Sequence, residues 1–102
     1  MLDAAHEALS FVDGRKRDDL DSDRMLTLAL MKELEIIGEA AYQMAEESRL
    51  EAVGIDWPAI IGMRHRLVHE YQEINLTVIW NTLQEDLPPL IEALEKILVV
   101  SR

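Results

Sequence analysis

The spacing of apolar residues between positions 25 and 44 is the feature that most constrains what this chain can fold into. Apolar side chains that recur every three or four residues share one face of a helix. The residues on that face are Leu26, Leu30, Leu34, Ile37, Ala41 and Met44, widened by Met25, Ala29, Ile36 and Ala40. We expect one long helix from a cap at Asp21 or Ser22 to about Glu47. Its apolar surface is wide enough to contact a second copy of the chain as well as its own core.

The rest of the chain also has helical spacing, and no segment alternates with the period of two that is typical of strands. A short helix over 4–12 should end at Gly14, and one further turn over 48–53 should end at Gly54. Other helices are expected to begin at Asp56-Trp57-Pro58, at Asn75 and at Leu87, where Pro88-Pro89 either opens a last helix or kinks a continuous one. The sequence therefore predicts an all-α, up-and-down bundle of about five helices, with residues 1–102 as a single domain.

Composition narrows the class of protein. The chain has 102 residues, no cysteine and a formal net charge of −10, so a disulfide scaffold and a thiolate zinc site are excluded. No apolar run approaches the roughly 20 residues of a membrane helix, and the N-terminus does not resemble a signal peptide. We expect a cytoplasmic protein without membrane contact. Because affinity for phosphate backbones comes mainly from Lys and Arg, contact with nucleic acid would be local, at Arg15-Lys16-Arg17 or at Arg64 and Arg66.

The segment from Arg64 to Tyr71 combines two arginines, two histidines and a tyrosine. On a straight helix Arg64 points into the middle of an apolar arc. The residues of that arc are Ile60, Ile61, Met63, Leu67, Val68 and Tyr71. A fixed positive charge on a burying face is unfavourable unless it is paired or used. Two interpretations stay open: an ion pair with Glu35 or Glu39 of the long helix, and a substrate phosphate held by the planar guanidinium.

His65 and His69 lie four residues apart and so share one helix face. A zinc site would need a third ligand, and the only other histidine is His6, so we expect no metal. RNA cleavage needs a base for the 2′-hydroxyl, an acid for the leaving oxygen and a cation for the phosphate, and histidine suits the first two near pH 7. Arg64 and His69 are separated by about 140° on an ideal helix. They meet only if the helix distorts or ends near Tyr71, or if two copies pair symmetrically.

Arg64, four residues, His69, one residue and Tyr71 resemble the R-x4-H-x-Y motif of HepT-like proteins, a branch of the HEPN group. The flanking sequence is similar to that family as well. The matching segments are Leu34 to Ala41 upstream, Trp57 and Gly62-Met63 just before the motif, and Val78 to Trp80 with Asp86-Leu87-Pro88 after it. The resemblance covers nearly the whole chain.

This resemblance implies an all-α bundle that forms a homodimer, with the motifs near the subunit interface. It implies a metal-independent ribonuclease toxin of a type II or type VII toxin–antitoxin pair, acting on RNA without a cofactor, with Arg64 and His69 as catalytic residues. It also implies a minimal nucleotidyltransferase antitoxin that attaches AMP to Tyr71. His65, Arg66 and Glu39 are expected to support the site. From the residues alone, Tyr71 has two open roles: a helix-end aromatic in the core, or an exposed hydroxyl beside Arg64.

Two other functions fit the residues. A non-catalytic nucleotide- or partner-binding helical module working with a nucleotidyltransferase is favoured by the net charge of −10, which suits a basic protein partner better than RNA. A helical dimer without any functional site would require Arg64 to be fully engaged in an ion pair with Glu35 or Glu39.

Overall fold

The computed structural model describes residues 1–44, 46–51 and 54–100, with the side chains of all of these except 47, 48, 51, 71 and 98–100. Within these ranges every regular element is helical, which confirms the all-α prediction. The longer helices are α1 (Leu2–Val12), α3 (Arg24–Gln43), α5 (Trp57–Glu70) and α7 (Leu87–Val100). The shorter elements are α2 (Asp19–Ser22), α4 (Glu46–Glu51), α6 (Leu76–Asn81), the 3-10 turn η1 (Tyr71–Glu73) and the π-helical turn η2 (Thr82–Asp86).

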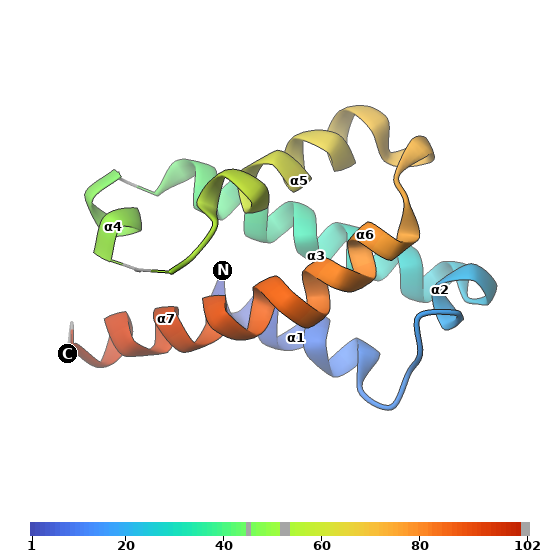
Figure 1. Ribbon diagram of the computed structural model, residues 1–102, viewed down its shortest axis with the longest axis horizontal. Coiled ribbons are helices and arrows are strands. Elements are labelled where there is room, and N and C mark those ends of the chain that lie inside the picture. Colours follow the sequence, from blue (N-terminus) through green and yellow to red (C-terminus); the bar gives the residue numbers. More distant parts are fainter. Residues whose placement is uncertain (45, 52–53, 101–102) are drawn as a thin grey trace.

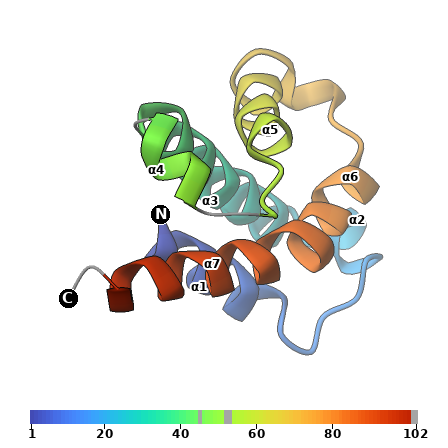
Figure 2. The same ribbon diagram turned by 60° about the vertical axis from the view of Figure 1, so that its left-hand side comes forward.

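Helix α3 is the centre of the fold. It packs against α5 on one side and α1 on the other, and α1 in turn packs on α7 (Figures 1 and 2). The largest side chains that are fully buried come from α3 and from the run α6–η2–α7: Leu30, Ile37, Ile79, Leu83, Leu87 and Leu90. The buried residues of α1, α3, α5 and the C-terminal helices form one continuous hydrophobic core with α3 at its centre.

Helix α3 is shorter at both ends than the sequence predicts. Its N-cap is Asp23, whose Oδ1 accepts a hydrogen bond from the Leu26 amide at 3.0 Å, and the predicted caps Asp21 and Ser22 lie instead in α2. The sequence alone could not single out Asp23, because Asp21 and Ser22 are equally suitable N-cap residues. At the other end the helix stops at Gln43 because Met44 adopts an extended conformation with ψ 143°. The predicted continuation to Glu47 is therefore wrong, and α4 begins after this break.

The turns and the later helix starts agree with the sequence, whereas α1 begins at Leu2 and α4 at Glu46, each two residues earlier than expected, and residues 52–53 of the expected turn lie outside the described part of the chain. Gly14 and Gly54 both have positive φ, 73° and 89°, a conformation that glycine adopts without a Cβ clash. Asn75 caps α6, its Oδ1 accepting a hydrogen bond from the Thr77 amide at 2.8 Å. Helix α7 begins at Leu87 as expected, and it also continues the helix before it through η2, as Figure 1 shows. The structure therefore combines the two interpretations of Pro88-Pro89. Helix α7 begins at Leu87, and it is continuous with α6 through η2, a helical turn wider than an α-helical one.

One side-chain contact fixes the start of α5. The indole Nε1 of Trp57 donates a hydrogen bond to the backbone oxygen of Arg49 at 2.9 Å. The contact ties α4 to the first residue of α5, so that the helix carrying the histidines is held at its N-terminus as well as along α3. In the described ranges no helix has the length and apolarity to cross a membrane.

Candidate functional site

Helix α5 buries a narrower stripe than the sequence predicts. The buried residues are Trp57, Ile60, Met63 and Leu67. Val68, expected on the apolar arc, is 41% exposed, and Ile61 is only partly buried. Arg64 faces α3 from within the arc, but its side chain is still 32% exposed, so the arc is covered only in part. The reason is that within one chain α5 packs mainly against α3, which covers only one side of the arc.

Gly38 lets α5 approach α3 at the position of Arg64. A Cβ at residue 38 would overlap the Cβ of Arg64 and would lie 3.1 Å from both the Arg64 Cγ and the backbone oxygen of Ile60. Only a residue without a side chain fits here. The backbone of Arg64 is therefore set directly against α3, and its guanidinium extends from that contact along the surface of α3.

Arg64 forms its ion pair with Glu39, the neighbour of Gly38. The distance from Arg64 Nη2 to Glu39 Oε2 is 2.8 Å, and the two side chains are 32% and 41% exposed. Of the two carboxylates considered from sequence, Glu39 is the partner, while Glu35 lies within 3.9 Å of Lys32. The ion pair leaves part of the hydrogen-bonding capacity of the guanidinium unused, because the buried Nε of Arg64 has no hydrogen-bond partner in the described part of the chain.

An open pocket of about 370 Å³ surrounds this ion pair. Its lining residues are Lys32, Glu35, Ile36, Glu39, Ala40, Gln43 and Arg64. Apolar side chains beside it face outward: Ile36 on α3 is 40% exposed, and Met25 and Leu28 farther along α3 are 83% and 44% exposed. The arginine thus lies next to an apolar surface that the chain itself does not cover.

The two histidines of α5 contact each other at the surface. Their ring centroids are 4.6 Å apart with an interplanar angle of 52°, and both side chains are exposed. His69 lines a different pocket, together with Glu70, Gln72 and Glu73. Arg64 is not among its lining residues.

Arg64 and His69 do not meet within one chain. Helix α5 is regular from Trp57 to Glu70, and the backbone changes only at Glu70, with φ −136° and ψ 27°. The separation of about 140° expected for five helical residues is therefore retained. The structure brings together Arg64 with Glu39 and His65 with His69, and it places these two pairs on different faces of α5.

The other predicted residues are placed less completely. Tyr71 is the first residue of η1, directly after α5, and its side chain lies outside the described part of the structure. Arg66 is exposed on α5. His6, the third histidine, is on α1 and lies 3.0 Å from Glu95. In the described ranges no three His, Cys, Asp or Glu side chains gather closely enough to hold a metal ion.

Sequence reasoning missed the role of Gly38. The signal was present, because a glycine inside a strongly amphipathic helix often marks a close approach of another backbone. It could not be interpreted alone, since the sequence does not say which residue of which helix crosses at that point.

A second ionisable pair lies away from these residues, between α1 and α3. Glu33 of α3 is buried, and desolvation, followed by its contact with Glu7 of α1, raises the pKa of Glu33 to about 7. Burial disfavours the charged form of a carboxyl group, and a neighbouring carboxylate adds to the effect. Because the two carboxyl groups lie where α1 packs on α3, we expect the stability of the fold to depend on the protonation of Glu33.

Comparison with known proteins gives a consistent set of relatives. The family whose profile matches this chain is described as "Ribonuclease HepT-like", and the match covers residues 1–97. A "Putative RNase" of Caldanaerobacter subterraneus subsp. tengcongensis is 38% identical over 87 residues, which is 85% of this chain and 78% of the relative. A "Probable ribonuclease HepT" of Thermococcus cleftensis is 30% identical over 100 residues, 94% of this chain and 91% of the relative. No solved structure matches the chain.

Proposed function

This chain belongs to the HepT-like ribonuclease family, and we propose that it is the RNA-cleaving toxin of a toxin–antitoxin pair, active in the cytoplasm without a metal ion. In this proposal residues 1–102 act as one HepT-like helical domain, Arg64 and His69 are the catalytic residues, and His65, Arg66 and Glu39 support them. The observation that carries the proposal is the arrangement on α5. One rigid helix holds an incompletely satisfied arginine against Gly38 and Glu39 and presents two contacting histidines to solvent.

The chemistry assigned to these residues is transfer of the phosphodiester to the neighbouring 2′-oxygen. A neutral His69 takes the proton of the 2′-hydroxyl, and the 2′-oxygen bonds to phosphorus while the bond to the 5′-oxygen of the next nucleotide breaks. A protonated histidine gives its proton to that leaving oxygen. The guanidinium of Arg64 stabilises the negative charge that builds on the phosphate oxygens. The products are a cyclic phosphate end and a free 5′-hydroxyl.

A symmetric pair of chains resolves the separation of Arg64 from His69. Two copies facing each other across one cleft would supply Arg64 from one copy and His69 from the other, with a second histidine as the acid. The uncovered apolar residues Ile36 on α3 and Val68 on α5 lie on the elements that carry the site and favour such an interface. The homodimer is therefore part of the proposed function.

Control by the antitoxin would act at the end of the same helix. A nucleotidyltransferase would transfer AMP from ATP to Tyr71: the phenolic oxygen bonds to the α-phosphorus, and pyrophosphate leaves. Tyr71 directly follows Glu70, the last residue of α5, and is the first residue of the turn η1. The other two residues of that turn, Gln72 and Glu73, are exposed. Intact mass after incubation with the antitoxin and ATP should show added AMP, and Tyr71→Phe should show none.

Cleavage of single-stranded RNA by purified protein in the presence of EDTA tests the proposal. We expect His69→Ala to lose at least about a hundredfold in rate, which is the usual contribution of a general acid or base, and Arg64→Ala to lose a similar amount. His6→Ala is the matched control, because His6 is an exposed histidine paired with Glu95 on the other side of the fold. Equal cleavage by His69→Ala and His6→Ala would refute the catalytic assignment.

The same assay separates the second candidate function. A non-catalytic module for a nucleotidyltransferase is favoured by the net charge of −10, which repels RNA and attracts a basic partner. That function predicts no cleavage by the unmodified protein, together with a complex that His69→Ala leaves intact.

A further inference from the structure

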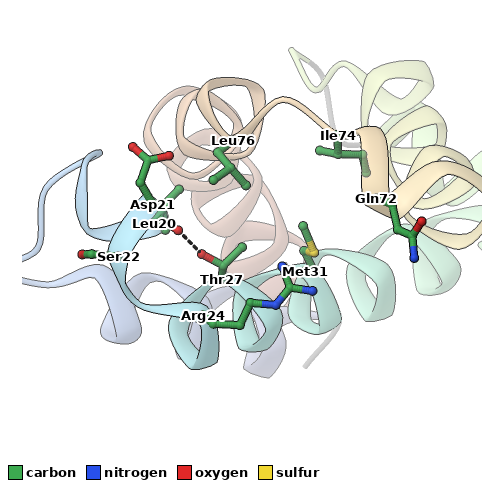
Figure 3. Close-up of a pocket in the computed structure, with 9 residues that line it drawn as sticks. All are labelled: Leu20, Asp21, Ser22, Arg24, Thr27, Met31, Gln72, Ile74 and Leu76. Carbon is green, nitrogen blue, oxygen red and sulfur yellow. Dashed lines mark hydrogen bonds between the residues drawn. The ribbon is translucent and has the colours of Figure 1, made fainter.

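A hollow between the start of α3 and the segment joining α5 to α6 has no part in the cleavage chemistry described above. It measures about 510 Å³, within the range of roughly 300–1,000 Å³ typical of small-ligand sites. Figure 3 shows its lining residues: Leu20, Asp21, Ser22, Arg24, Thr27, Met31, Gln72, Ile74 and Leu76. The hollow therefore joins residues that lie about fifty positions apart in the sequence.

The lining has an apolar part and a polar part. Leu20 and Ile74 are buried, and Met31 and Leu76 are partly buried, so a ligand would meet an apolar surface between them. The hydroxyl of Thr27 is already used, since it donates a hydrogen bond to the backbone oxygen of Leu20 at 2.7 Å (Figure 3). The other polar side chains that line the hollow are Asp21 and Ser22 of α2, Arg24 and Gln72. Such a combination suits a flat, partly apolar ligand that also carries charge.

Although the whole chain is acidic, this rim carries one positive charge, on Arg24, that is unpaired within the described ranges. Asp21 is neutralised by Arg17, whose Nη1 lies 2.7 Å from Asp21 Oδ2. Arg24 is exposed, and in the described part of the chain its guanidinium has neither an ion pair nor a hydrogen bond. Figure 3 shows it extended along α3 toward Met31. The planar guanidinium is therefore available to an anion, and it matches a phosphate group.

The hollow adjoins the pocket of His69. Gln72 lines both: it borders the Arg24 hollow on one side and lies with His69, Glu70 and Glu73 on the other. A chain of nucleotides bound at His69 would thus reach the Arg24 hollow with its next unit. Single-stranded RNA commonly binds proteins in this way, with bases turned onto side chains and phosphates held by cations.

We propose that the Arg24 hollow binds one nucleotide unit of the RNA beside the cleavage position, with the base on Met31, Ile74 and Leu76 and the adjoining phosphate on Arg24. This inference rests on the proposed ribonuclease function and assigns it a substrate subsite. It makes Arg24 a binding residue that acts on affinity and leaves the proton transfers at His69 unchanged.

Binding of a short fluorescent single-stranded RNA to the full chain tests the subsite, in a His69→Ala background that prevents cleavage. Anisotropy titrations at several salt concentrations give Kd and the slope of log K against log salt. We expect Arg24→Ala to raise Kd about five- to tenfold and to reduce the slope by about 0.7, the value for one phosphate contact on a single strand. Lys96→Ala is the control: it removes the same charge from α7, where Lys96 pairs with Glu92, and it should leave the slope unchanged.

A second variant tests the base-binding half without changing charge. Ser22→Phe places a bulky side chain at the exposed rim and should weaken binding while the salt slope stays as in the parent. Both Arg24→Ala and Ser22→Phe should raise KM for cleavage in the otherwise unmodified protein and leave kcat nearly unchanged.

The outcomes separate failure of the subsite from failure of the function. If the unmodified protein cleaves RNA and Arg24→Ala keeps the parent Kd and slope, the subsite is refuted while the ribonuclease proposal stands. If the protein neither binds nor cleaves RNA, both are refuted. Methyl NMR of methionine-labelled protein gives a third readout: if added AMP shifts the Met31 methyl signal and added RNA does not, the hollow takes a free nucleotide and the RNA subsite is wrong.

Discussion

Replacing Gly38 by alanine is the perturbation whose effect follows most directly from the structure. The new methyl group would overlap the Cβ of Arg64 and press on the backbone oxygen of Ile60, 3.1 Å away. Neither atom belongs to the mobile end of a side chain. Because the most favourable separation of non-bonded carbon atoms is about 3.5–4.0 Å, α3 and α5 would have to move apart by more than about 1 Å at their closest point.

The expected magnitude combines two opposing terms. Overpacking of this kind usually costs about 1–3 kcal/mol, and a backbone oxygen that cannot move places Gly38→Ala at the upper end. Alanine regains about 1 kcal/mol in a helix interior relative to glycine. We therefore expect a net loss of about 2 kcal/mol in the free energy of unfolding, together with at least about tenfold slower RNA cleavage, because Arg64 is displaced from its position.

Gly62→Ala is the matched control for this experiment. Gly62 lies inside α5, and a Cβ at that position would meet nothing within 4 Å. The same substitution there should be neutral or stabilise by up to about 1 kcal/mol. Urea unfolding followed by circular dichroism measures both variants. A Gly38→Ala protein as stable as Gly62→Ala would refute the close approach of α3 and α5.

Two further predictions concern carboxyl groups of α3. Because the pKa of Glu33 is raised to about 7 in the folded state, the folded protein should lose stability as pH rises from about 4.5 to 7, by up to about 3 kcal/mol at about 1.4 kcal/mol per pKa unit. Glu33→Gln should flatten this dependence in urea midpoints measured at pH 5 and pH 8, and an unchanged dependence would show that Glu33 is not its source. Glu39→Ala should slow cleavage about tenfold at unchanged KM, since Glu39 orients Arg64, yet change stability by less than about 1 kcal/mol because the pair is partly exposed. Glu35 lines the same pocket, and Glu35→Ala should change neither the cleavage rate nor the stability appreciably.

Much of the fold follows from local patterns. Periodicity predicted the all-α class, glycines predicted the left-handed turns at Gly14 and Gly54, and Asn75 predicted the start of α6. The end of α3 was not predictable in this way. No glycine or proline marks the break at Met44, and Met44 itself still fits the apolar spacing of α3. The break therefore depends on tertiary contacts, such as the Trp57 hydrogen bond that holds α4 against α5.

The site was predictable as a set of residues and less so as an arrangement. The charged residue on a burying face pointed to Arg64, and helical spacing placed His65 beside His69. The choice of Glu39 over Glu35 depends on where α5 crosses α3, which Gly38 determines. The exposure of Val68 also has no local cause, because it reflects a surface that a single chain leaves uncovered.

The central claim is that Arg64 of one copy and His69 of another act at one site. Its most direct test is a purified heterodimer in which one subunit carries Arg64→Ala and the other His69→Ala, isolated by two different affinity tags. We predict RNA cleavage at least roughly tenfold above that of either mutant homodimer, because one wild-type copy of each residue still meets across the interface. A heterodimer as inactive as both homodimers would show that the two residues must belong to the same subunit and would contradict the shared site.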